Sequence, residues 1–324
     1  MVLAWLFPGQ GSQYVGMGKD LLDASAGARA VFERVDAALG EPLSRLILEG
    51  PETELTITAN AQPAIVAMSC AVLAALRERM PDLPEPDFSA GHSLGEYSAL
   101  VAADALTLED AVRVVRVRGR AMQEAVPQGT GAMSAVLGIE QARLEELCAQ
   151  AAQGEVVSPA NFNAAGQIVI AGHAGAVARV GELAAAEKGR AISLKVSAPF
   201  HCALMAPAAR VLEAELERIA VRPPRFPIVA NFDARPNTEA ARVRGLLVRQ
   251  VDGVVRWEAS VRAMAAAGVT RALEIGPGKV LAGLVKRTTK DVTVTSVGDV
   301  ASLEQACTFP WSGCGETSSG GSRL

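Results

Sequence analysis

The chain has 324 residues, more than one hydrophobic core usually serves, so we expect two domains or one large domain with an insertion. Half of the residues are hydrophobic and 20% are charged, which excludes a wholly disordered or fibrous protein. Only 4% are aromatic, and 31 basic against 35 acidic residues give a formal net charge of −4, so the composition predicts no nucleic-acid partner.

The sequence also predicts a protein without membrane association. No window reaches the roughly 18 uninterrupted apolar residues that a membrane span needs. Residues 1–7 lack the basic start of a signal peptide and end at Pro8, so we expect a cytoplasmic protein. The cysteines are five in number and show no CxxC spacing, which argues against a disulfide or zinc framework.

Short apolar runs alternate with amphipathic stretches, a pattern typical of an α/β fold with parallel strands. The first half should contain a strand, two helices with Pro63 in the first turn of the second, a short strand and a long helix. These predicted elements cover residues 2–7, 28–39, 62–79, 88–91 and 107–126.

From residue 131 the pattern changes to strand, helix, strand, strand, helix, strand, which is the ferredoxin-like βαββαβ order. These elements are predicted over residues 132–138, 141–153, 156–162, 167–171, 174–187 and 191–196. We therefore predict a ferredoxin-like subdomain over 128–196, inserted into an α/β core formed by 1–127 and 197–306.

The core pattern resumes after the insertion. Helices are expected near 205–219, 240–250 and 258–267, and strands at 227–231, 272–275 and 292–297. Residues 307–324 are rich in Gly, Ser and Thr and lack periodicity, which predicts a disordered tail.

The most informative motif is GHSLG at 91–95, a G-x-S-x-G between a predicted strand and a predicted helix. In that setting the glycines allow a strained turn that exposes the serine hydroxyl, and the helix N-terminus offers N–H groups to an oxyanion. A plain turn is the alternative. The context favours Ser93 as a nucleophile.

A nucleophilic serine needs a base, and the chain has three histidines. His92 is adjacent to Ser93 in an extended segment, so its ring should point to the opposite side of the turn. His173 falls at a predicted helix start, where a solvated or capping role is expected. His201, in a loop that re-enters the core, is therefore the predicted base. No acid is assigned as its partner by sequence.

Arg118 lies in the middle of the apolar face of the helix predicted over 107–126. Such an arginine must be paired or face a cleft, because burying an uncompensated charge is costly. The two interpretations are a structural ion pair and a bidentate clamp for a substrate carboxylate. Arg113, Arg116 and Arg120 lie on the opposite side, which we predict to be solvated.

Two glycine-rich loops follow predicted strands. The loop at 7–13 lacks the Walker lysine and the G-x-G-x-x-G spacing, so it predicts neither a phosphate nor a dinucleotide site, but its backbone N–H groups could complete an oxyanion hole. The loop at 276–279 is best explained as the start of a helix.

Seven segments, in order along the chain, resemble the bacterial malonyl-CoA:acyl-carrier-protein transacylase family, and the match runs from residue 3 to about 306. They are FPGQGSQ (7–13), GHSLGEYSAL (91–100), RGRAMQ (118–123), NFN (161–163), PFHCALM (199–205), VRQ (248–250) and EIGPGK (274–279).

The resemblance implies a serine hydrolase-like parallel-sheet core with the ferredoxin-like subdomain inserted. It further implies that malonyl-CoA acylates Ser93, that His201 activates Ser93, and that Arg118 holds the malonyl carboxylate. The N–H groups of Gln10 and Leu94 would form the oxyanion hole. The main-chain carbonyl of Gln250 would orient the histidine in place of a carboxylate.

The implied partners are malonyl-CoA and holo acyl carrier protein, whose phosphopantetheine thiol accepts the malonyl group for fatty-acid synthesis. We expect a monomer with no metal or redox cofactor. An acyltransferase of a polyketide pathway, a serine thioesterase and a catalytically silent carrier-binding subunit are the alternatives. In the related polyketide enzymes a Phe-His pair such as Phe200-His201 accompanies a preference for malonyl over methylmalonyl groups.

Overall fold

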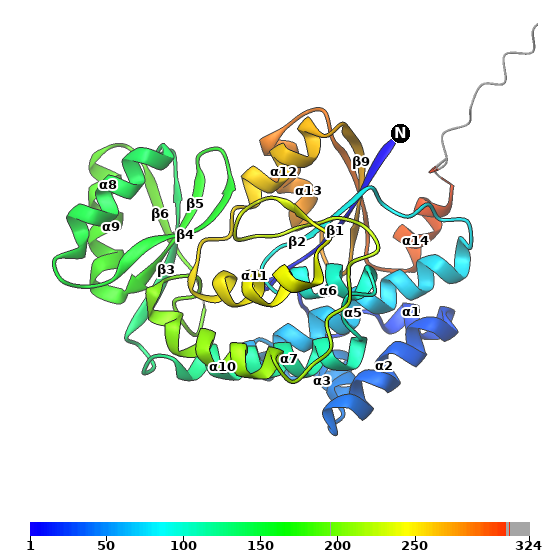
Figure 1. Cartoon of the computed structure of the whole chain (residues 1–324). Helices are drawn as coiled ribbons and strands as arrows, with labels where there is room; N and C mark the ends of the chain where they lie inside the picture. Colours follow the sequence, from blue (N-terminus) through cyan, green and yellow to red (C-terminus); the bar gives the residue numbers. More distant parts are fainter. Residues whose placement is uncertain (195, 309–310, 312–324) are drawn as a thin grey trace, which may run out of the picture.

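A six-stranded sheet in the order β10-β9-β1-β2-β7-β8 forms the centre of the larger part of the molecule (Figure 1). The computed structural model describes residues 1–194, 196–308 and 311. Neighbouring strands run parallel except for the last pair, β7 and β8. The strands are β1 (Val2–Phe7), β2 (Phe88–Gly91), β7 (Ile228–Val229), β8 (Pro236–Asn237), β9 (Val269–Ile275) and β10 (Thr293–Val297).

Helices cover both faces of this sheet because side chains alternate along each strand. In β1, Leu3, Trp5 and Phe7 belong to one buried cluster, whereas Ala4 and Leu6 belong to another. The first cluster includes residues of α1 (Lys19–Ala24), α2 (Ala26–Leu39), α3 (Leu43–Glu49), α4 (Glu52–Leu55), α5 (Thr58–Arg79), α6 (Gly95–Ala102), α7 (Leu108–Glu124), α10 (Ala206–Leu216) and α11 (Ala240–Asp252). The second includes residues of α12 (Trp257–Ala266) and α13 (Val280–Thr288).

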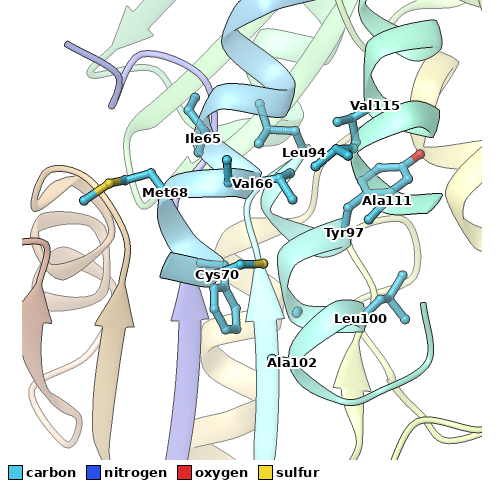
Figure 2. Packing of buried hydrophobic residues seen from close by; sticks show 14 of the residues in the cluster. Ile65, Val66, Met68, Cys70, Leu94, Tyr97, Leu100, Ala102, Ala111 and Val115 are labelled. Carbon is cyan, nitrogen blue, oxygen red and sulfur yellow. The ribbon is translucent and has the colours of Figure 1, made fainter. Parts of the chain in front are cut away.

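Helices α5, α6 and α7 pack together beneath the predicted nucleophile. Figure 2 shows Leu94 and Tyr97 gathered with Ala111 and Val115 of α7 in one hydrophobic cluster. Helix α5 has the length and hydropathy of a membrane span, but 83% of its apolar window is buried, as expected for a core helix. It begins four residues earlier than predicted, so Pro63 lies inside the helix and not in its first turn.

The second sheet is antiparallel and has the order β4-β5-β3-β6, with α8 and α9 packed on it (Figure 1). Its elements are β3 (Gly131–Leu137), α8 (Gln141–Ala152), β4 (Val157–Ala164), β5 (Gln167–His173), α9 (Ala174–Ala186) and β6 (Arg190–Ser193), with a buried cluster of their own. This is the ferredoxin-like arrangement that the sequence predicts. The domain limits at 127/128 and 196/197 stay predictions.

The C-terminal prediction needs a correction. Helix α14 (Val300–Cys307) extends to the first residue of the predicted tail. Trp311 is 5% exposed, and its Nε1 donates to the carbonyl oxygen of Ala306 at 2.8 Å. The prediction that the chain is disordered from residue 307 is therefore wrong for Cys307 and Trp311. Burying the indole of Trp311 removes a large apolar area from water and holds this residue on the core. Residues 309–310 and 312–324 of that prediction lie outside the described residues.

Candidate active site

Ser93 lies in a tight turn between β2 and α6, with a positive φ of 51°. The turn requires its glycines. A Cβ on Gly91 would lie 1.9 Å from the carbonyl carbon of Gly95, and a Cβ on Gly95 would lie 2.3 Å from the oxygen of Phe7. Glycine at both positions therefore lets the helix start directly above the strand, and the strained turn exposes the serine side chain.

His201 contacts the Ser93 hydroxyl. Its Nε2 lies 2.8 Å from Oγ of Ser93, and its Nδ1 lies 2.7 Å from the carbonyl oxygen of Gln250. Because a carbonyl only accepts hydrogen bonds, Nδ1 carries the proton and Nε2 is left to accept from the serine. The geometry is that of a nucleophile, a base and an orienting group.

The electrostatic surroundings keep His201 neutral. The side chain is 4% exposed, and burial, followed by the nearby positive charge of Arg118, lowers the pKa of His201 to about 3. The imidazole is thus neutral at pH 7, with its proton on Nδ1, and its Nε2 is able to accept a second proton.

The guanidinium of Arg118 lies beside the same hydroxyl. It is 2% exposed; Nη1 donates to Oε1 of Gln62 at 2.7 Å, and Nη2 donates to Oε1 of Gln250 at 2.9 Å and to Oγ of Ser93 at 3.1 Å. Within the described part of the chain these acceptors are amide and hydroxyl oxygens, and Nε has no partner. Burial lowers the pKa of Arg118. The Arg118 guanidinium is therefore a buried cation without a hydrogen-bonded anion among the described residues, and a ligand carboxylate could fill that role.

One residue on the opposite side of α7 departs from the prediction. Arg116 is 7% exposed, pairs with Glu41 and donates to Asn60, so it is not part of a solvated face. Helices packed against α7 from the N-terminal region cover this position, which a single helical wheel does not reveal. Arg113 has a side chain that is 51% exposed, as predicted.

A cavity of about 360 Å³ opens over Ser93. Its lining includes Gln10, Ser93, Arg118, Phe200 and His201, together with Gln62 and Met122 of the core helices and Met133, Asn161, Asn163 and Val169 of the ferredoxin-like sheet. The buried side chains of Leu94 and Gln250 are 1% and 0% exposed. The cavity thus lies where the core meets the ferredoxin-like sheet, a common position for ligand sites.

Two histidines have other surroundings. His92 lines the cavity and its Nε2 lies 2.8 Å from Oδ1 of Asn163, so the expectation that its ring points away from the site is wrong. The positive φ of Ser93 bends the turn and breaks the simple alternation of an extended segment. His173 precedes α9, and its Nδ1 accepts from the backbone N–H of Val156 at 2.9 Å, a structural role.

Sequence reasoning missed a buried polar network beneath Ser93. Oε2 of Glu96 accepts from the backbone N–H of Asn231 at 2.9 Å and from Nε2 of Gln250 at 2.8 Å. Oδ1 of Asn231 accepts from the backbone N–H of Ser93 at 2.6 Å. Burial raises the pKa of Glu96 to about 7. We call the GHSLG turn at residues 91–95 the elbow. The sequence offered one signal for this network, because Glu96 is a charged residue directly after the elbow on a largely apolar helix.

The loop at 7–13 also joins the site. Oε1 of Gln10 accepts from Oγ1 of Thr58 at 3.0 Å, and Thr58 accepts from Nε2 of Gln62 at 3.1 Å. Because Gln62 also binds Arg118, a chain of side-chain hydrogen bonds connects the loop with the guanidinium. A Cβ on Gly9 would lie 2.5 Å from the oxygen of His92, so the loop and the elbow are in close contact.

Comparison with known proteins agrees with this geometry. Residues 4–307 match the family described as the acyl transferase domain. The chain is 46% identical over 306 residues to the malonyl CoA-acyl carrier protein transacylase of Salmonella typhimurium, covering 94% of this chain and 98% of that one. The corresponding protein of Bacillus subtilis is 47% identical over 307 residues, covering 94% and 96%.

Solved structures give the same result. An acyl carrier protein S-malonyltransferase from Vibrio cholerae superposes with a TM-score of 0.92 at 44% identity, covering 94% of this chain and 100% of that one. A malonyl-transacylase in complex with its type II PKS acyl-carrier protein gives a TM-score of 0.92 at 44% identity, covering 95% and 99%. The chain is therefore similar to these proteins in sequence and has the same fold over the part that matches.

Proposed function

Because this chain belongs to the malonyl CoA-acyl carrier protein transacylases, we propose that it carries a malonyl group on Ser93 from coenzyme A to acyl carrier protein. The product would supply extender units for fatty-acid synthesis. The main observation in its support is a pair of hydrogen bonds, one between Ser93 Oγ and His201 Nε2 and one between His201 Nδ1 and the carbonyl oxygen of Gln250.

In the first half-reaction His201 takes the proton of the serine hydroxyl while Oγ attacks the thioester carbonyl of malonyl-CoA. The tetrahedral intermediate collapses, the bond to sulfur breaks, and His201 returns the proton to the coenzyme A thiolate. In the second half-reaction His201 takes the proton of the phosphopantetheine thiol, whose sulfur attacks the malonyl-serine ester. Ser93 then leaves and regains the proton.

The oxyanion hole is the part of the proposal that depends on backbone groups. The N–H of Ser93 is already bound by Asn231, so it is not available to an oxyanion. Leu94 is the N-cap residue of α6, where N–H groups point out of the helix end, and Gln10 lies in the loop that touches the elbow. We assign the two donors to the N–H groups of Leu94 and Gln10.

Arg118 supplies the selectivity in this proposal. It already donates to the Ser93 hydroxyl, so a malonyl group attached to that oxygen brings its free carboxylate close to the guanidinium. Two charge-assisted hydrogen bonds would replace those to neutral oxygens. Phe200 lines the same cavity, and in this proposal it would restrict the space beside the malonyl methylene.

The cellular setting is also part of the proposal. The four cysteines described are free thiols, as in proteins of the reducing cytoplasm, so we place the reaction there. The enzyme would act as a monomer and meet a soluble carrier protein, and its reaction needs no metal or redox cofactor.

Intact-mass spectrometry after addition of malonyl-CoA tests the proposal. The wild type should gain one malonyl group, which disappears when holo acyl carrier protein is added, and Ser93→Ala should gain none. Ser98→Ala is a matched control, because Ser98 is a buried serine on α6 whose hydroxyl has no partner among the described residues. An adduct that persists on Ser93→Ala, or its absence from wild type, would contradict the proposal.

A further inference from the structure

The half-reactions above make no use of Glu96, a carboxyl group that is 2% exposed beneath the nucleophile. Burying a carboxyl group costs free energy unless hydrogen bonds compensate for it. Glu96 lies in the first turn of α6, where the helix dipole favours an acidic side chain. The dipole acts equally on an exposed acid, so it does not explain why Glu96 is buried. The groups that donate hydrogen bonds to Glu96 therefore indicate why this carboxyl group is buried.

One of these bonds fixes the elbow through Asn231. The backbone N–H of Asn231 donates to Oε2 of Glu96 at 2.9 Å. The side chain of Asn231 then holds both sides of the turn, because Oδ1 accepts from the N–H of Ser93 at 2.6 Å and Nδ2 donates to the oxygen of Gly91 at 2.7 Å. A shift of Asn231 would thus be passed directly to the backbone of the nucleophile.

The other bond fixes the direction of the Gln250 amide. Nε2 of Gln250 donates to Oε2 of Glu96 at 2.8 Å and to the carbonyl of Ser93 at 2.9 Å. With the NH₂ group turned toward these acceptors, Oε1 faces Arg118 and accepts from it at 2.9 Å. The same residue binds His201 through its main-chain carbonyl. Oε2 of Glu96 therefore binds both residues, Asn231 and Gln250, that hold Ser93, His201 and Arg118 in place.

We propose that Glu96 is a positioning residue for malonyl transfer, holding Asn231 and Gln250 so that His201 and Arg118 keep their contacts with Ser93. This inference rests on the proposed function. Glu96 does not line the cavity over Ser93, so it acts through Asn231 and Gln250. Its effect should fall mainly on kcat, because the Ser93 backbone and the base depend on these two supports, whereas Arg118 keeps its bond to Gln62.

Two conservative variants distinguish the effect of side-chain length from the effect of charge. Glu96→Gln keeps an oxygen at the position of Oε2 and loses the charge, whereas Glu96→Asp keeps the charge and shortens the side chain by one methylene. We expect kcat for malonyl transfer to stay within about 3-fold in Glu96→Gln. In Glu96→Asp kcat should fall by about 10–100-fold with KM for malonyl-CoA within about 3-fold, since misplacing a catalytic group by about 1 Å costs up to about 100-fold.

Glu274→Asp is the matched control. Glu274 is 0% exposed, and its carboxylate accepts from the N–H groups of Leu281 and Ala282 and from Ser296, outside the network of Glu96. Its variant should lose thermal stability and keep its kcat. If Glu96→Asp behaves in the same way, Glu96 is a structural residue and the proposal fails. It also fails if Glu96→Gln is as slow as Glu96→Asp.

Asn231→Ala covers the case in which Glu96→Asp does not fold. It removes one of the two supports and should lower kcat with little effect on KM, and an unchanged kcat would overturn the inference. Formation of the malonyl adduct on wild type is measured separately. A wild type that forms no adduct refutes the proposed function, whereas normal acylation with unaffected variants refutes only the role of Glu96.

Discussion

At the scale of single residues, Arg118 should both attract malonyl groups and reject acetyl groups. An acetyl group would leave the buried guanidinium without an anion, and a malonyl group would pair with it. We expect Arg118→Ala to lower kcat/KM for malonyl-CoA by about 100-fold or more, while the value for acetyl-CoA holds or rises. Arg113→Ala, on the exposed side of the same helix, is the control. A malonyl-to-acetyl ratio unchanged in folded Arg118→Ala would rule out the clamp.

His201 should make the folded protein sensitive to acid. Its pKa is lowered from 6.5 to about 3 in the folded state, so the unfolded chain binds the additional proton between these values. Above pH 6.5 this group does not reduce the free energy of unfolding. Below pH 6.5 it lowers the free energy of unfolding by about 1.4 kcal/mol per pH unit. Glu96 acts oppositely, because its raised pKa stabilises the fold at low pH and that contribution is lost between pH 4.5 and about 7.

Urea denaturation of wild type and His201→Gln at pH 7, 6 and 5 measures this effect. The Glu96 contribution is common to both proteins, so the difference isolates the histidine. On going from pH 6 to pH 5, the free energy of unfolding of the variant should therefore rise relative to that of the wild type. Parallel curves for the two proteins would show that His201 is not held neutral by burial.

At the scale of elements, the elbow depends on the close approach of β2 and α6. A methyl group on Gly91 would lie 1.9 Å from the carbonyl carbon of Gly95 and 2.0 Å from its oxygen, so the helix would have to move. We expect Gly91→Ala to lower the free energy of unfolding by about 3 kcal/mol or more and to abolish acylation of Ser93. Thermal melting and intact-mass spectrometry provide the two measurements.

Gly245→Ala is the control within a helix. Gly245 lies inside α11, and no atom among the described residues is within 4 Å of its added Cβ. Alanine there should raise stability by about 0.5–1 kcal/mol through helix propensity. If Gly91→Ala is tolerated as well as Gly245→Ala, the elbow is not held as tightly as its contacts indicate.

At the scale of the whole molecule, the first strand and Trp311 contribute to one hydrophobic core. The side chain of Trp311 belongs to the same buried cluster as Leu3, Trp5 and Phe7 of the first strand. Ending the chain at Thr308 should therefore lower the free energy of unfolding by about 3 kcal/mol, the usual cost of removing a buried large aromatic side chain. The kcat should not change, because Trp311 does not line the cavity. Melting temperatures of full-length protein, the truncated chain and Trp311→Ala measure this, and equal values would contradict it.

The sequence by itself determined much of the architecture and pointed to the proposed nucleophile. Strand and helix periods are local properties, so the α/β core and the ferredoxin-like order could be read from apolar spacing, with ends displaced by a few residues. The G-x-S-x-G motif pointed to Ser93 because the local turn requires Gly91, whose added Cβ would meet the backbone of Gly95 and Glu96, whereas Gly95 is required by the distant backbone of Phe7 and Pro8. Arg118 was recognised from its own helix, since a charge in the middle of an apolar stripe contradicts the local pattern.

Only the tertiary structure decided which distant groups surround Ser93. His201, Gln250 and Asn231 are 108, 157 and 138 residues away from it in sequence. His201 and Asn231 lie in turns and Gln250 lies on α11, and only the packing of the fold brings these three segments to Ser93. Without an alignment or the fold, the sequence offered elimination for His201, a family resemblance for Gln250 and nothing for Asn231. Burial of Arg116 and Trp311 was missed for the same reason, because burial depends on which other segments cover a side chain. The pKa values of His201 and Glu96 follow from that burial, so they too belong to the folded structure.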